Sequence, residues 1–304
     1  MRRPTDSIGA RSLLALLLAP MLLVAPAFAA CPPEGQTAAS LQALKALKFE
    51  MSDIDARKPL AMGLIACLGD PDPVMRDDIA YSALAAWMRA NAFDADTLRA
   101  MRDALYAQLD GDDEAGFRRP YAALVLSEVA RTDRIKPWMT PEERTAMVEK
   151  AAGFVESVHD YRGFDDKEGW RHGIAHGSDW LMQLALNPAL EKQQTDRILA
   201  AVAAQVVPDA APTYVFGESG RLARPVVYIA QRALYSEAEW TTWFAKLVPR
   251  IGDPALAWND SHWLARRHDL MAFLMSLYIE ADQSEDANIH QLKPVIVATV
   301  KAVP

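Results

Sequence analysis

Three polar side chains near the middle of the chain have the types and spacing of a metal site. His172, His176 and Asp179 fall within about 60° of one another if the segment is placed on a helix at about 100° per residue. Imidazole nitrogens and carboxylate oxygens are ligands that zinc and other divalent cations accept. The spacing therefore predicts a divalent metal site. The alternative is a solvated helix face, on which Asp179 only fixes the tautomer of a histidine.

Other polar residues could complete such a site. Glu218 and Asp165 are candidates for a fourth ligand or a general base, and Arg221 for a cation that clamps an anionic group of a substrate. Attack by metal-bound water would then make the protein a hydrolase. The position after His172 is Gly173, so the glutamate base that follows the first histidine in zincin metalloproteases is missing.

A second polar stripe lies further along the chain. His262, Arg266 and Asp269 share one face of a predicted helix over 261–281. A solvated face with an Arg–Asp pair is the simpler interpretation, because such pairs are common on helices. If the helices curve around a common groove, His262 and Arg266 instead bind a ligand beside His172.

The elements that position these residues are predicted to be helices. Apolar residues recur every three or four positions, and Pro, Gly and Asp separate the segments in place of Asn-Gly hairpin turns. Thr140-Pro141 and Ser236 are typical helix starts. The predicted helices are 37–48, 57–68, 73–91, 95–109, 118–132, 141–158, 170–187, 189–206, 220–235, 237–249, 261–281 and 284–301.

The predicted helices form two interleaved sets. Within each set the starts advance by about 40 to 50 residues, close to the period of two-helix HEAT and armadillo repeats. This spacing predicts an all-α fold, a right-handed α-α superhelix of two-helix repeats. A closed α/α toroid would give the same pattern and is the alternative.

Three short motifs resemble a bacterial family catalogued as domain of unknown function 2785. Its pattern is Arg-Gly-aromatic-Asp, then Gly-Trp-x-His with a second His and an Asp, then Gly-Glu-x-x-Arg-Leu. The resemblance covers roughly 60–280 and implies that the matching residues form one site on a helical-repeat scaffold, with Arg162, Trp170 and Arg221 among the ligand contacts, but it implies no reaction. The matching residues are Arg162, Gly163, Phe164, Asp165, Gly169, Trp170, His172, Ala175, His176, Asp179, Glu218, Arg221 and Leu222.

The first thirty residues have the pattern of a secretory signal peptide. A positive start with Arg2 and Arg3 precedes a short apolar run over 13–24, and the small-x-small pattern Ala27-Phe28-Ala29 follows. We therefore expect a signal peptide over 1–30, a single all-α helical-repeat domain over 31–304, and a periplasmic or secreted protein.

The sequence allows three chemical states of the two cysteines. In an oxidising compartment Cys31 and Cys67 could form a disulfide that ties the N-terminal arm to the second helix. Two free thiols are also compatible with the sequence. Cys31 follows Phe28-Ala29-Ala30, which is close to a lipoprotein cleavage box, so lipid anchoring at Cys31 is a third, less favoured, alternative.

Composition limits the partners. The formal net charge is -8, which disfavours nucleic acid and anionic membrane surfaces because both are bound by clustered Lys and Arg. After the first thirty residues no apolar stretch is long enough to span a membrane. Two functions remain: a scaffold that binds a protein, a peptide or a small anionic ligand, and a metal-dependent hydrolase that uses His172, His176 and Asp179. The sequence does not decide whether the protein is an enzyme.

Overall fold

The computed structural model of the chain describes residues 30–304. The predicted signal peptide over 1–30 lies outside these residues, except for Ala30. No helix within the described part is long and apolar enough to cross a membrane.

The described chain is almost entirely helical, so the predicted all-α class is confirmed. The α-helices are α1 (Ala38–Ala46), α2 (Arg57–Leu64), α3 (Ser82–Arg89), α4 (Ala95–Leu109), α5 (Arg118–Ile135), α6 (Pro141–Glu156), α7 (Gly173–Ala185), α8 (Lys192–Val206), α9 (Glu218–Gln231), α10 (Glu237–Ala245), α11 (Ser261–Gln283), α12 (Ala287–His290) and α13 (Lys293–Ala302). The shorter helical turns are η1 (Ile65–Gly69), η2 (Val74–Tyr81), η3 (Val248–Ile251) and η4 (Pro254–Leu256), of which η2 is a π-helix.

Local capping explains where several helices begin. Thr140 and Glu143 form a capping box at the start of α6, and Pro141 is the first helical residue, where its missing N–H costs no hydrogen bond. Ser236 and Glu239 cap α10 in the same way. These are the starts that the sequence predicts.

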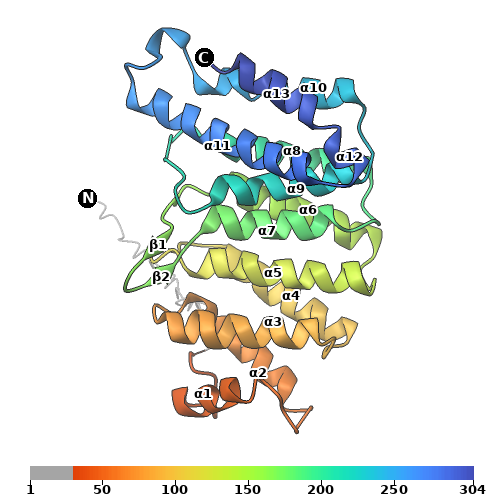
Figure 1. Cartoon of the computed structure of the whole chain (residues 1–304). Coiled ribbons are helices and arrows are strands. Elements are labelled where there is room, and N and C mark those ends of the chain that lie inside the picture. Colours follow the sequence, from red (N-terminus) through yellow and green to blue (C-terminus); the bar gives the residue numbers. More distant parts are fainter. Residues whose placement is uncertain (1–29) are drawn as a thin grey trace, which may run out of the picture.

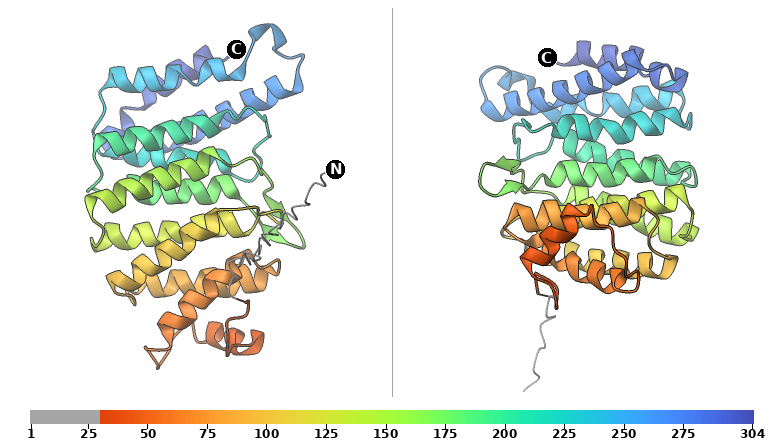
Figure 2. Two further views of the ribbon diagram at one scale, coloured as in Figure 1. Left: turned by 180° about the vertical axis from the view of Figure 1, so that it is seen from behind. Right: turned by 60° about the horizontal axis from the view of Figure 1, so that its bottom comes forward.

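The helices form two layers (Figures 1 and 2). Helices α3, α5, α7, α9 and α11 follow one another along the stack and form the front layer. Helices α4, α6, α8 and α10 lie behind them and form the rear layer. Helices α1 and α13 lie at opposite ends of the stack, so the alternative of a closed toroid is wrong for the described chain.

One continuous hydrophobic core joins the two layers. Buried apolar side chains from Leu41 to Ile296 belong to a single cluster. Large fully buried side chains, such as Trp180 in α7 and Trp263 in α11, fill the space between the helices. Burial of this kind is the main force that holds stacked helices together.

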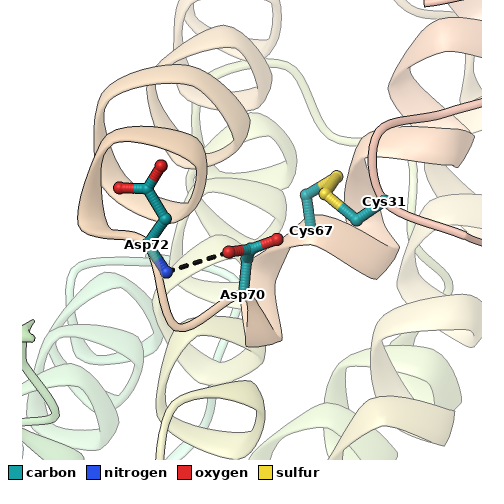
Figure 3. The surroundings of a disulfide bond; sticks show 4 residues. All are labelled: Cys31, Cys67, Asp70 and Asp72. Carbon is teal, nitrogen blue, oxygen red and sulfur yellow. Dashed lines mark hydrogen bonds between the residues drawn. A yellow bond between two sulfur atoms is a disulfide. The ribbon is translucent and has the colours of Figure 1, made fainter. Parts of the chain in front are cut away.

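A disulfide ties the N-terminal arm to η1 (Figure 3). Cys31 and Cys67 are bonded, with their Cα atoms 5.2 Å apart. The next turn is held by a hydrogen bond of 2.9 Å from the backbone N–H of Asp72 to Oδ1 of Asp70. Of the three alternatives for the cysteines, the structure contains the disulfide.

Candidate functional site

The segment before α7 forms a small hairpin in place of the first turns of a helix. Strands β1 (Phe164–Asp165) and β2 (Gly169–Trp170) pair antiparallel and project from one edge of the stack (Figure 1). Oδ1 of Asp165 accepts the backbone N–H groups of Lys167 and Glu168 at 2.8 and 3.0 Å. Asp165, a predicted catalytic residue, is therefore an exposed residue that stabilises the hairpin turn.

His172 lies between this hairpin and α7. Its backbone is left-handed, with φ of 56°, and α7 begins only at Gly173. Its ring stacks on Trp170 at 4.5 Å between centroids, and its Nε2 lies 3.1 Å from the carbonyl oxygen of Phe216. The predicted helix over 170–187 thus begins three residues late, so His172 is not on the helical stripe that the sequence predicts.

His176 is a buried residue of α7. Its ring meets the ring of Tyr121 edge-on at 5.0 Å and lies 5.9 Å from the ring of His172. Its Nδ1 is buried and has no hydrogen-bond partner. Burial, together with the positive charge of Arg221, lowers the pKa of His172 to about 4 and that of His176 to about 3. Both imidazoles are therefore neutral at pH 7.

The third predicted metal ligand, Asp179, is engaged by two arginines. The carboxylate of Asp179 pairs with Arg221 and lies 3.9 Å from Arg224, both in α9. Within residues 30–304 no group of three His, Cys, Asp or Glu side chains is placed to hold a metal ion. The prediction that His172, His176 and Asp179 share one metal is thus not met, because the first is outside the helix and the last faces α9.

Glu218 and Asp269 fix the loop that precedes α9. Glu218 is buried, and its Oε2 accepts the backbone N–H of Phe216 at 2.9 Å. Oδ1 of the buried Asp269 accepts the backbone N–H of Tyr214 at 2.9 Å, whereas its Oδ2 has no partner. Burial raises the pKa of Glu218 and raises that of Asp269 to about 7.

This buried cluster offers no space to a substrate. Oε1 of Glu218 lies 3.9 Å from Nε2 of His172, so two predicted site residues do meet. The cavity that they line together with Gly173 and Tyr214 has no room for a water molecule. The geometry makes His172 and Glu218 part of the contact between α7, α9 and the loop over 207–217.

The remaining predicted site residues are scattered. Arg162 is exposed at the hairpin, where it pairs with Asp160 at 2.5 Å, and Trp170 is half-buried. His262 is exposed at the start of α11, and Nε of Arg266 donates to the carbonyl of Ile251 at 2.8 Å. The structure brings neither His262 nor Arg266 to the histidines.

A charged surface on the front layer was not predicted. Nε of Arg89 donates to both carboxylate oxygens of Glu128 at 3.1 Å, which links α3 to α5. Nε of Arg134 donates to Oε1 of Gln183 at 3.3 Å, which links α5 to α7. We call this surface the arginine face; its charged residues are Arg89, Glu128, Arg131, Arg134, Asp179, Arg221 and Arg224.

The arginine face is accessible to solvent. The side chains of Arg89 and Arg224 are 55% and 48% exposed, and that of Arg221 is 35% exposed. Two spacings in the sequence indicate the arginine face. Arg131 precedes Arg134 by three residues, and Arg221 precedes Arg224 by three. Residues three apart on a helix are neighbours on its surface.

Comparison with known proteins agrees with the sequence motifs. No curated protein and no solved structure matches the chain. One family model, described as "Protein of unknown function (DUF2785)", matches residues 105–279. The match spans more than half of the chain and includes α5, α7, α9 and most of α11, that is, the hairpin, the buried histidines and most of the arginine face. The chain belongs to this family.

Proposed function

We propose that the protein is an exported binding scaffold whose front layer engages a partner through the arginine face. Residues 31–304 then form a single domain, a superhelix of two-helix repeats of the HEAT and armadillo kind. The two-layer stack and the single core support this architecture. The disulfide supports export, because such bonds persist in oxidising compartments.

The observation that supports binding is the excess of positive charge on one surface of an acidic chain. Five arginines share the arginine face with two carboxylates, while the whole chain has a formal net charge of -8. Their Cα atoms lie on packed helices and not on loops, so the points from which the arginine side chains extend are held in a fixed arrangement. Large surfaces of this kind are what stacked helical repeats use to bind partners.

The metal-dependent hydrolase is less well supported. Its proposed ligands do not converge, and its proposed base, Glu218, is buried against a cavity without room for water. The neutral histidines instead pack against aromatic rings and a backbone carbonyl, which is a structural role.

Affinity capture from a periplasmic extract tests the binding function. The protein, secreted with its own residues 1–30, is immobilised as wild type, as the double variant Arg131→Gln/Arg224→Gln, and as Lys246→Gln, a control at the exposed end of α10 in the rear layer. We expect wild type and control to retain the same proteins and the double variant to lose them. Equal retention on all three, or no retention, would overturn the proposal.

A further inference from the structure

Next to the arginine face, the front layer exposes two large apolar side chains. Helix α11, which packs against α9, exposes Met275 and Ile279, whose exposed fractions are 45% and 50%. The two residues are four apart and so lie on one side of the helix. Methionine side chains are flexible and polarisable, which suits a surface that adapts to a bound apolar group.

This apolar stripe is adjacent to the arginines. A Cβ added at Gly220 would lie 3.8 Å from Oγ of Ser276, so the start of α9 packs beside the centre of α11. Gly220 is one turn before Arg224, and Ser276 follows Met275 directly. Arg224 and Met275 therefore lie on neighbouring helices, whose axes are about 8–10 Å apart.

The arginines lack sufficient internal counter-charge. Asp179 pairs with Arg221 and is near Arg224, and Glu128 pairs with Arg89. Within residues 30–304 Arg131 has no ion pair. Burial and the neighbouring Arg131 lower the pKa of Arg134, and Tyr228 and Glu128 offset only part of this effect.

We infer that the partner of this surface is a peptide segment with both carboxylates and apolar side chains, the carboxylates binding Arg131, Arg134 and Arg224 and the apolar groups covering Met275 and Ile279. The inference rests on the proposed function. Arginine binds a carboxylate through two parallel hydrogen bonds, which favours this group over an uncharged one.

The dimensions and the composition of the surface favour a peptide over other anions. From α5 to α11 the surface spans three steps between helix axes, about 25–30 Å, which an extended peptide of about eight residues covers. A small anion would occupy only one pair of arginines. A nucleic acid would leave Met275 and Ile279 against charged phosphates, and the chain's overall charge of -8 would repel it.

Selection from a random peptide library displayed on phage tests the inference. The immobilised full chain selects peptides, which are then labelled with fluorescein and titrated with each variant while anisotropy is recorded. We expect enrichment of Asp and Glu together with Leu, Phe or Met. We also expect about tenfold weaker binding to Arg131→Gln/Arg224→Gln and to Met275→Gln/Ile279→Gln, as for loss of one or two interface contacts.

Matched controls separate these effects from misfolding. Lys246→Gln changes a charge on the rear layer, and Ile54→Gln changes an apolar residue that is 66% exposed before α2. Both should bind as wild type does. If a double variant unfolds, the salt dependence of wild-type binding tests the inference in its place. Contacts between carboxylates and arginines weaken steeply as the salt concentration increases.

The outcomes distinguish the inference from the function on which it rests. Selected peptides that lack carboxylates but still lose affinity for the arginine variant overturn the acidic peptide and leave the arginine face as a binding surface. Selected peptides whose affinity is unchanged in both double variants overturn both. Absence of any selected peptide overturns the inference, and capture from the extract then decides the function alone.

Discussion

At the scale of single residues, the two histidines stabilise the fold as neutral groups. The pKa of His172 is about 4, below the value of about 6.5 for an unfolded imidazole, so falling pH protonates the unfolded chain first. Its contribution to stability is fully present above about pH 6.5 and is lost as the pH falls through 6.5 toward 4.

A glutamine at position 172 removes this titration and keeps an N–H donor for the carbonyl of Phe216. Between pH 7 and pH 5 we expect the free energy of unfolding of the wild type to fall by about 2 kcal/mol more than that of His172→Gln. Urea unfolding at the two pH values measures the difference. Parallel pH profiles would contradict the neutral, buried state of His172.

The titration of Asp269 changes the stability with pH in the opposite direction to that of His172. Because burial raises its pKa to about 7, the folded state binds the proton more tightly, and stability increases as the pH falls from above 7 toward about 4. Asp269→Asn keeps an oxygen for the N–H of Tyr214 and removes the charge. We expect the variant to gain roughly 1–2 kcal/mol at pH 8 and little at pH 5. Equal destabilisation at both pH values would show that the charge has no such cost.

At the scale of elements, a glycine sets the distance between α6 and α7. A Cβ at Gly177 would lie 2.6 Å from Cγ2 of Val155, whereas one at Gly153 in α6 would meet no atom within 4 Å. Helix propensity alone favours alanine at both positions by about 1 kcal/mol. At Gly177 the close contact should outweigh this preference, so that alanine destabilises the protein there.

We therefore expect Gly177→Ala to destabilise the protein by about 1–3 kcal/mol and Gly153→Ala to stabilise it by about 0.5–1 kcal/mol. Thermal unfolding of both variants measures this, and Val155→Ala should partly rescue Gly177→Ala. A stabilised Gly177→Ala would mean that α6 and α7 do not approach this closely.

The sequence predicts the elements better than their junctions. The bounds of α4 match the prediction over 95–109, because Asp94 caps the helix and apolar residues follow the helical period. The hairpin before α7 was missed, since its strands have two residues each and Nη2 of Arg76 holds its turn through the carbonyl of Glu168 at 2.7 Å. That contact joins residues 92 positions apart, beyond any local pattern.

In the candidate site, too, the sequence does not predict contacts that depend on how distant segments pack. The spacing of His172 and His176 correctly predicts that their rings are close, but a left-handed residue moves the first out of the helical register. The arginine face depends on which helices adjoin, as when Asp179 of α7 meets Arg221 of α9. Such pairs appear only once the helices are stacked.

At the scale of the whole molecule, the disulfide fixes one end of the stack. It closes a loop with a sequence separation of 36, for which the loss of chain entropy in the unfolded state corresponds to about 4 kcal/mol. We expect reductant to lower the melting temperature of the wild type and to leave Cys31→Ser/Cys67→Ser unchanged. A wild type that melts at the same temperature with and without reductant would show that the bond does not stabilise the fold.

The stack also separates two kinds of surface. The hairpin and the loop over 207–217 gather aromatic rings at one edge, whereas the arginine face and the stripe of Met275 and Ile279 extend across the helices of the front layer. The proposed function assigns the partner to the second surface and a structural role to the first.

Hydroxyl-radical footprinting of the chain with a selected peptide tests this assignment most directly. We expect peptide binding to protect Met275 and the half-buried Tyr228 of α9 from oxidation, and to leave Trp258, which is 65% exposed outside this surface, oxidised as in the free chain. Unchanged oxidation of Met275 and Tyr228 with protection of Phe164 and Phe216 would place the partner at the hairpin and contradict binding through the front layer.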